Sequence, residues 1–246
     1  MTSAASRIVV VAADASARPA AAVLARRLNL PFDESTTASD LRLIQSDDGL
    51  SLHDPQSGAR LRVEFTDALL RRLRGSRGPL RRAIGRGARD VVDATAGLGQ
   101  DAVHLVALGH RVTAIERDPV VSALAQDGLA RAGGVLDAAN PRWLIGDARV
   151  LLPVLDSRPD TIYLDPMFPP KRKKSAAVRK EMYLLHRLGI VDEGAAELLA
   201  VARGCARDRV VVKRPVDAPP LAVGVTAAYA GKLVRYDVYR PTAART

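Results

Sequence analysis

The chain has little cysteine, little acidic charge and no long apolar run. Its one cysteine, Cys205, cannot form an internal disulfide, so we expect a buried thiol in an intracellular protein. The apolar run near the N-terminus, "RIVVVAA", is far too short to span a membrane, and the order of charge, apolar core and cleavage site typical of a signal peptide is missing. These absences predict a cytoplasmic protein, and 48% hydrophobic residues can fill its core.

Acidic residues are outnumbered: 27 Asp and Glu stand against 37 Lys and Arg, which gives a net charge of +10. Such an excess favours a polyanionic partner such as nucleic acid, although a compositional bias toward Arg and Ala would produce the same sum. The four histidines show no metal-ligand spacing, so we expect no metal site. They are His53, His104, His110 and His186.

Two regions differ in their pattern. Residues 1–78 combine one strand-like run, one helical run and two alternating strands, which predicts a small α+β domain. The Arg-, Gly- and Pro-rich stretch 69–82 is typical of a connection between domains. In residues 79–246 short apolar strands alternate with helices, which predicts a doubly wound, mostly parallel sheet. Two alternating runs around Gly231 predict an antiparallel strand pair at its C-terminal end.

Ligands of such sheets bind beyond the carboxyl ends of the strands, and four of these ends carry marked residues. In "VVDATAGLGQDA", Asp93 ends a strand, Gly97 and Gly99 let the backbone turn and approach a ligand, and a helix begins near Asp101. The same letters satisfy a dinucleotide-binding pattern, so this loop alone leaves the ligand open.

Carboxylates at the next two strand ends suit a nucleoside. Glu116 can accept hydrogen bonds from both ribose hydroxyls, and Asp147 can accept one from an adenine amino group. Asp147 also suits a simple helix cap, which is how we interpret Asp118 before Pro119.

The fourth strand end, "TIYLDPMFPPKRKK", decides against hydride transfer. The lone pair of a nucleobase amine is delocalised into the ring, so methylation requires acceptors that orient the nitrogen. The carboxylate of Asp165 and the carbonyl of Pro166 can accept its two N–H bonds, while Phe168 stacks on the base. These residues resemble the Asp/Asn-Pro-Pro-aromatic motif of class I S-adenosylmethionine-dependent amino-methyltransferases, with Met167 in place of the second proline.

A closer resemblance covers residues from about 90 onward. The stretches "DATAGLGQDA", "IERDPVVSALAQDGLARA", "YLDPMFPPKRKKSAAVRKEM" and "VVVKRPVDAPPLA" are similar to those of the small-subunit ribosomal RNA methyltransferase J family. The resemblance implies methylation of N2 of a guanosine in 16S rRNA, with S-adenosyl-L-methionine as donor and S-adenosyl-L-homocysteine as product. It also implies the donor-binding residues, which are Gln100, Asp101, Glu116, Arg117, Asp147, Ala148 and Asp165.

Cations follow the Asp-Pro turn directly, where phosphates that flank an extruded guanine would lie. We therefore predict RNA contacts from the run, although a solvated charge run is the usual alternative. Lys213 and Arg214 would border the same cleft, or simply neutralise Asp165. The predicted RNA-binding residues are Lys171, Arg172, Lys173, Lys174, Lys213 and Arg214.

The sequence thus predicts a methyltransferase whose partner is 16S rRNA or the small ribosomal subunit, without a membrane or a metal. Three alternatives stay open at this point: an amino-methyltransferase for a DNA base or a protein glutamine, an NAD-dependent oxidoreductase, and a non-catalytic RNA-binding module. The bound ligand separates them, because only the methyltransferases take S-adenosylmethionine and only the oxidoreductase takes NAD.

Overall fold

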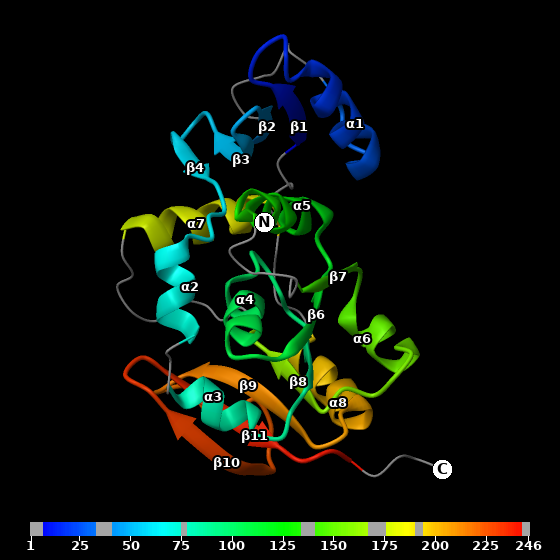
Figure 1. The fold of residues 1–246 in the computed structure, drawn as a ribbon, viewed down its shortest axis with the longest axis vertical. Helices are drawn as coiled ribbons and strands as arrows, with labels where there is room; N and C mark the ends of the chain where they lie inside the picture. Colours follow the sequence, from blue (N-terminus) through cyan, green and yellow to red (C-terminus); the bar gives the residue numbers. More distant parts are fainter. Residues whose placement is uncertain are drawn as a thin grey trace, which may run out of the picture. The chain divides into compact units, whose positions relative to one another are not determined.

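The computed structural model describes residues 7–32, 41–74, 78–133, 141–166, 176–189 and 194–242 (Figure 1). These residues form two compact units, each built from segments that are distant in sequence. The described parts of Met1–Glu64, Ala123–Arg131 and Phe168–Val191 form the smaller unit, and those of Phe65–Ser122, Ala132–Met167 and Asp192–Thr246 form the larger unit. The division into domains 1–78 and 79–246 stays a prediction.

The smaller unit contains a four-stranded sheet with strand order β1-β2-β3-β4. Strands β1 and β2 pair in parallel, and the other neighbours are antiparallel. The elements are β1 (Ile8–Ala12), α1 (Arg18–Leu28), β2 (Leu41–Ser46), β3 (Gly49–Asp54), β4 (Ala59–Leu61) and α7 (Ala176–Arg187). Helix α7 is fixed by Tyr183, whose hydroxyl donates to Asp54 Oδ2 at 2.7 Å. The strand-like, helical and alternating runs predicted within residues 1–78 are confirmed by β1, α1, β2, β3 and β4.

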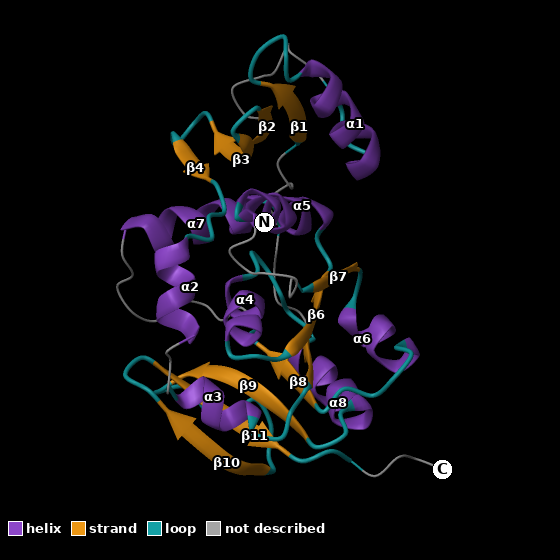
Figure 2. Ribbon diagram, in the orientation of Figure 1, coloured by secondary structure: helices purple, strands orange, loops and turns teal. Residues whose placement is uncertain are grey.

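The larger unit contains a sheet of seven described strands in the order β10-β11-β9-β8-β5-β6-β7 (Figure 2). Strands β9 to β7 in this order run parallel, and β11 and β10 are antiparallel. The strands are β5 (Asp90–Asp93), β6 (Arg111–Glu116), β7 (Arg142–Ile145), β8 (Thr161–Leu164), β9 (Arg209–Pro215), β10 (Val225–Ala230) and β11 (Val234–Tyr239). The predicted doubly wound sheet with an antiparallel C-terminal pair is confirmed.

Helices cover both faces of this sheet. Helices α3 and α4 contact one face, and α6, the adjoining 3-10 helix and α8 contribute to the apolar cluster on the other. The helices that begin in this unit are α2 (Asp67–Arg74), α3 (Pro79–Ile84), α4 (Gln100–Ala107), α5 (Pro119–Arg131), α6 (Ala148–Leu151), the 3-10 helix (Leu152–Val154) and α8 (Ala195–Cys205).

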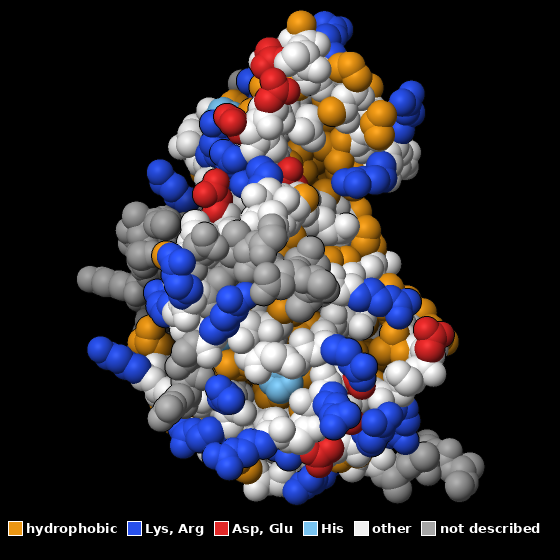
Figure 3. Space-filling view, in the orientation of Figure 1, with side chains coloured by type: hydrophobic (Ala, Val, Ile, Leu, Met, Phe, Trp, Pro, Cys, Tyr) orange, Lys and Arg blue, Asp and Glu red, His pale blue; other side chains and the backbone are white. Residues whose placement is uncertain are grey.

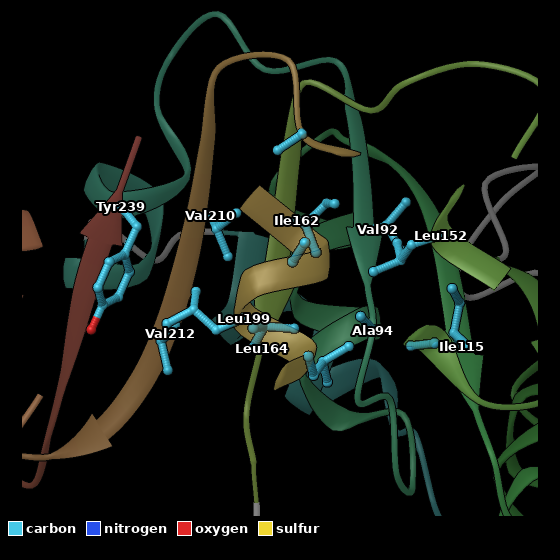
Figure 4. Packing of buried hydrophobic residues seen from close by; sticks show 14 residues of the cluster. Val92, Ala94, Ile115, Leu152, Ile162, Leu164, Leu199, Val210, Val212 and Tyr239 are labelled. Carbon is cyan, nitrogen blue, oxygen red and sulfur yellow. The ribbon is translucent and has the colours of Figure 1, made fainter. Parts of the chain in front are cut away.

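Side chains at alternate positions of the strands point to different faces of the sheet, one toward the apolar cluster and the other toward α4. In Figure 4, Val210 and Val212 of β9, Ile162 and Leu164 of β8 and Leu199 of α8 belong to one buried cluster. Because successive strand residues point to opposite faces, the residues that alternate with them point to the other face, which carries α4. These include Tyr163 on β8 and Lys213 on β9, and both lie near the carboxyl edge.

The stretch 69–82, which we predicted to include the connection between domains, is largely helical in its described residues. Helix α2 ends at Arg74 and α3 begins at Pro79, so only four residues join them. Leu and Arg are strong helix formers, and α2 packs against α4. The Arg-, Gly- and Pro-rich composition suggested a linker in this stretch. Packing against α4 instead stabilises helix α2 there.

Candidate active site

The site lies at the carboxyl edge of the larger sheet, where a glycine-rich loop follows β5. Gly97 and Gly99 have φ values of +53° and +82°, which favour glycine. The Gly97 N–H donates to Glu116 Oε2 at 2.8 Å, and the Asp118 N–H donates to Glu116 Oε1 at 2.8 Å. Glu116 therefore ties the loop after β5 to the loop after β6, and burial raises the pKa of its carboxyl.

Gly99 also lies close to two aromatic rings. A Cβ atom at this position would lie 3.2 Å from Cζ2 of Trp143 and 3.6 Å from Cζ of Phe65. The residue caps α4, so the helix begins directly behind the loop and directs its first N–H groups to the same edge. The close Trp143 ring and the positive φ both favour glycine here.

One ammonium group joins the two carboxylates of this edge. Lys213 Nζ lies 2.6 Å from Asp101 Oδ2 and 2.9 Å from Asp165 Oδ2. The Tyr163 hydroxyl donates to the same Asp101 oxygen at 2.7 Å, and the Asp165 N–H donates to Thr95 Oγ1 at 2.6 Å. Asp165 thus has its backbone fixed from the loop after β5 and its side chain fixed from β9.

This arrangement shifts the pKa values of all three charged groups. Burial and the negative charge of Asp101 raise the pKa of Asp165 to about 6, against the opposing effect of Lys213. Burial alone would lower the pKa of Lys213, but Asp165 and Asp101 outweigh it and raise that pKa. For Asp101 the lysine outweighs burial, and the pKa is lowered.

Asp93 is a buried acceptor that is only partly used. It is 1% exposed, and its Oδ1 accepts the Thr95 N–H at 3.2 Å. Within the described residues its Oδ2 has no hydrogen-bond partner. Burial, with the charges of Asp101 and Asp165 added, raises the pKa of Asp93 well above its usual value. An acceptor of this kind, beside a glycine cradle, suits a ligand that carries amino and hydroxyl groups.

Comparison with known proteins identifies the ligand class. Residues 23–241 match the sequence profile of a family described as putative SAM-dependent methyltransferases. The chain belongs to this family. The match covers most of the chain, and the residues of the loop, Asp93 and the carboxylates of Glu116 and Asp165 fit S-adenosylmethionine, which supplies an activated methyl group when it is bound.

Relatives place this methyltransferase more closely. Proteins named ribosomal RNA small subunit methyltransferase J share 42% identity in Thioalkalivibrio sulfidiphilus, covering 95% of this chain and 97% of that protein, and 43% in Edwardsiella ictaluri, covering 94% and 96%. A crystal structure of a SAM-dependent methyltransferase from Neisseria gonorrhoeae is 32% identical with a TM-score of 0.76, covering 96% and 97% of the two chains. The family and the class I methyltransferase fold predicted from the sequence are confirmed.

Asp147 of this methyltransferase caps a helix. Its Oδ1 accepts the Arg149 N–H at 2.8 Å, and its carboxylate also pairs with the Arg149 guanidinium, which contacts Glu197 at 2.6 Å. Asp118 likewise caps α5 through the N–H groups of Val120 and Val121. Both caps are confirmed, and the contact of Asp147 with adenine stays a prediction.

The other predicted residues differ in where the structure places them. Gln100 and Arg117 are exposed at the two loops, whereas Ala148 is buried at the start of α6 and Pro166 is buried after Asp165. Arg214 is 5% exposed, and its guanidinium donates to the Pro219 carbonyl. Five predicted residues lie outside the described residues: Phe168, Lys171, Arg172, Lys173 and Lys174.

Sequence reasoning missed the partners of the central carboxylates. Tyr163 and Thr95 hold Asp101 and Asp165, and Tyr236 lies opposite Lys213 on β11. The Tyr163 and Tyr236 rings are 6.4 Å apart between centroids. Strand parity could have indicated Tyr163, because it lies two residues before Asp165 and so shares its face.

Two searches of the described residues found nothing further. No helix in that part of the chain is long and apolar enough to cross a membrane. No group of three or more His, Cys, Asp or Glu side chains among the same residues could hold a metal ion.

Proposed function

We propose that this methyltransferase transfers a methyl group from S-adenosylmethionine to the exocyclic N2 of a guanosine in 16S rRNA of the small ribosomal subunit. The observation that carries the proposal is Asp165, an acceptor fixed by Lys213 and Thr95 at the carboxyl edge. The names of the relatives support ribosomal RNA as the substrate class. The site of action would then be the cytoplasm.

The donor would lie against the loop after β5 and the carboxylates around it. The Gly97 and Gly99 backbone permits close approach, and Asp93 Oδ2 offers a buried acceptor. Glu116 uses one lone pair of each oxygen on the backbone and keeps the others for ribose hydroxyls. The proposed donor-binding residues are Asp93, Gly97, Gly99, Gln100, Asp101, Glu116, Arg117, Asp147, Ala148 and Asp165.

The reaction requires positioning more than acid or base strength. The Asp165 carboxylate and the Pro166 carbonyl would accept the two N–H bonds of the target amine, and Phe168 would stack on the base. Transfer is then a direct displacement at the sulfonium methyl without a covalent enzyme intermediate. Once the nitrogen has attacked, it becomes acidic, and Asp165 is the nearest carboxylate for its proton.

Lys213 has a positioning role in this proposal. Its ammonium lies between Asp101 and Asp165, so it favours the ionised form of Asp165 and fixes the direction of one oxygen. This supports the alternative in which Lys213 neutralises Asp165. The basic run Lys171, Arg172, Lys173 and Lys174 remains the proposed contact with phosphates flanking the target, with Lys213 at the same edge. Arg214 is instead 5% exposed, donates to the Pro219 carbonyl and shares the face of Val212 on β9, so we do not include it in this contact.

Mass spectrometry of nucleosides tests the proposal. We expect 16S rRNA from cells without this protein to lack one N2-methylguanosine, and the purified protein with S-adenosylmethionine to restore it. The Asp165→Ala variant, with donor binding confirmed by calorimetry, serves as the inactive control. Restoration on another base, or methylation of DNA or of a glutamine instead, would contradict the substrate assignment and leave the family assignment intact.

A further inference from the structure

Residues 68–89 of the larger unit carry positive charge only. They include eight arginines and no Asp, Glu or Lys. Those on the two helices are Arg71, Arg72 and Arg74 of α2 and Arg81 and Arg82 of α3, and all five are exposed. We call Arg71, Arg72, Arg81 and Arg82 the arginine surface. Figure 3 shows Lys and Arg side chains gathered on the face of the larger unit that carries α3.

Helix α2 begins beside the donor loop. Phe65, two residues before the helix, lies close to Gly99, and α2 packs against α4. Burial lowers the pKa of His104 on α4, and the positive charges of Lys213 and Arg72 add to this effect. Arg72 is therefore near enough to act electrostatically on the helix whose first turn carries Asp101.

Helix α3 begins at the same edge of the sheet and descends from it. Pro79 lies close to Gly231, in the turn between β10 and β11: a Cβ atom added at Gly231 would lie 3.3 Å from Cγ of Pro79. Val234, just after this turn, pairs with Pro215, two residues beyond Lys213 on β9. At the other end of the helix, the Ile84 carbonyl accepts the Thr161 hydroxyl at the start of β8. The arginine surface thus extends from the site edge down one side of the sheet.

The pairing of these arginines differs from that of other arginines in the unit. In the described part of the chain, none of the four is ion-paired with a carboxylate. Arg82 instead lies over the Tyr229 ring, 5.5 Å from its centroid. Four other exposed arginines of this unit have acidic partners: Arg111 pairs with Asp90, Arg142 with Asp156, Arg207 with Asp160 and Arg240 with Asp208.

We propose that the arginine surface binds phosphates of the RNA strand that flanks the target nucleotide, as a second contact separate from the basic run after Pro166. The proposal rests on the proposed function, because it takes RNA as the substrate. Unpaired guanidinium groups match phosphate geometry with two N–H donors and are more weakly hydrated than ammonium groups. Their position beside the site edge would hold the strand while the target base enters the site.

Salt dependence measures this contact directly, because each phosphate that the protein neutralises releases a counterion. The slope of log affinity against log salt concentration changes by roughly 0.7 for each contact with single-stranded RNA. If all four arginines bind phosphates, replacing them by Gln should flatten the slope by about 3. The affinity for S-adenosylmethionine should stay unchanged, because none of the four belongs to the donor loop.

The matched control removes the same charge from ion-paired, exposed arginines. The side chains of Arg111, Arg142, Arg207 and Arg240 are 76%, 64%, 59% and 63% exposed. Fluorescence anisotropy with a labelled single-stranded RNA oligonucleotide, at a series of salt concentrations, compares both fourfold Gln variants with wild type. Circular dichroism confirms that each variant is folded, and KM for 16S rRNA should rise only in the arginine-surface variant.

The outcomes separate this proposal from the proposed function. An arginine-surface variant with the wild-type slope, or an equal loss in both variants, overturns the proposal while wild type still methylates 16S rRNA. If the slope flattens only in the arginine-surface variant but wild type leaves 16S rRNA unmethylated, the surface binds RNA and the rRNA substrate is wrong.

Discussion

The amino edge and the carboxyl edge of the larger sheet are formed by the same strands but differ in how their carboxylates pair with cations. At the amino edge the carboxylates pair with arginines, as in the pair of Asp90 and Arg111, whose N···O contacts are both 2.7 Å, and Asp208 contacts both Arg209 and Arg240. A pocket of about 340 Å³ opens there, between the starts of β5, β6 and β7. At the carboxyl edge one lysine serves two carboxylates, and Asp93 is buried beside them.

The difference shows that a cavity and charged residues are not sufficient for a reactive site. Exposed ion pairs such as that of Arg111 with Asp90 contribute little to stability. At the carboxyl edge, burial and the negative charge of Asp101 raise the pKa of Asp165, and the lysine that the two carboxylates share opposes this rise. The predictions below test whether this contrast between the edges is real.

The largest effect should come from removing the shared carboxylate. We expect Asp165→Ala to lower kcat/KM for rRNA methylation by about 100- to 1000-fold, because a preorganised acceptor for the amine is lost. RNA affinity should change little, since no phosphate contact is removed. The amino-edge control is Asp208→Ala, which should retain wild-type turnover with a radiolabelled methyl donor. Equal losses in both variants would contradict the assignment.

The next effect is on stability. In Lys213→Met, two carboxylates lose their common counter-charge in a partly buried position, which should lower the free energy of unfolding by roughly 2 to 4 kcal/mol. Arg111→Met removes an exposed cation from one carboxylate and should change stability little. Urea unfolding followed by circular dichroism measures both, and a similar midpoint for the two variants would show that the edges do not differ.

The pH profile should distinguish the edges within the active enzyme. If ionised Asp165 accepts the amine, kcat/KM should rise with pH up to about 6 and then level off. Because the pKa of Asp165 is raised in the folded state, its contribution to stability is full below the unfolded-state pKa of about 4 and is lost as pH rises through about 6.

Lysine variants sharpen this measurement. Since Lys213 opposes the rise in pKa of Asp165, Lys213→Met should move the acidic limb of the profile to higher pH, and Lys213→Arg should restore it. A limb that stays in place in Lys213→Met would show that another group controls it. The Asp208→Ala variant should keep the wild-type limb.

The smallest expected effect is on the affinity for S-adenosylmethionine, measured in variants at the two ends of α4. Gly99 and Gly109 both have positive φ, so alanine at either position costs about 1 to 2 kcal/mol of stability. Only at Gly99 does the new methyl group also meet Trp143, whereas nothing lies within 4 Å at Gly109. Calorimetry should show weaker S-adenosylmethionine binding in Gly99→Ala and wild-type binding in Gly109→Ala.

Local patterns predicted much of the fold and one half of the site. Alternating strands, the glycine turn and the cap at Asp118 depend on residues that are neighbours in sequence, so the local sequence pattern predicts them. The pairing of Lys213 with Asp101 joins residues 112 positions apart, and no local pattern encodes it. The helical character of 69–74 was hidden for the same reason, because α4 stabilises α2 from a distance in sequence.

The strand order also determines when the site can form during folding. Asp165 reaches the Thr95 hydroxyl across 70 residues, and Lys213 reaches Asp165 across 48 more. Such long loops close slowly, so β8 must pair with β5, and β9 with β8, before the carboxylates have their counter-charge. If the methyl donor binds at these carboxylates, as proposed above, a newly made chain acquires donor binding only after these long-range strand pairs have formed, and donor binding can serve as a kinetic probe of the completed sheet.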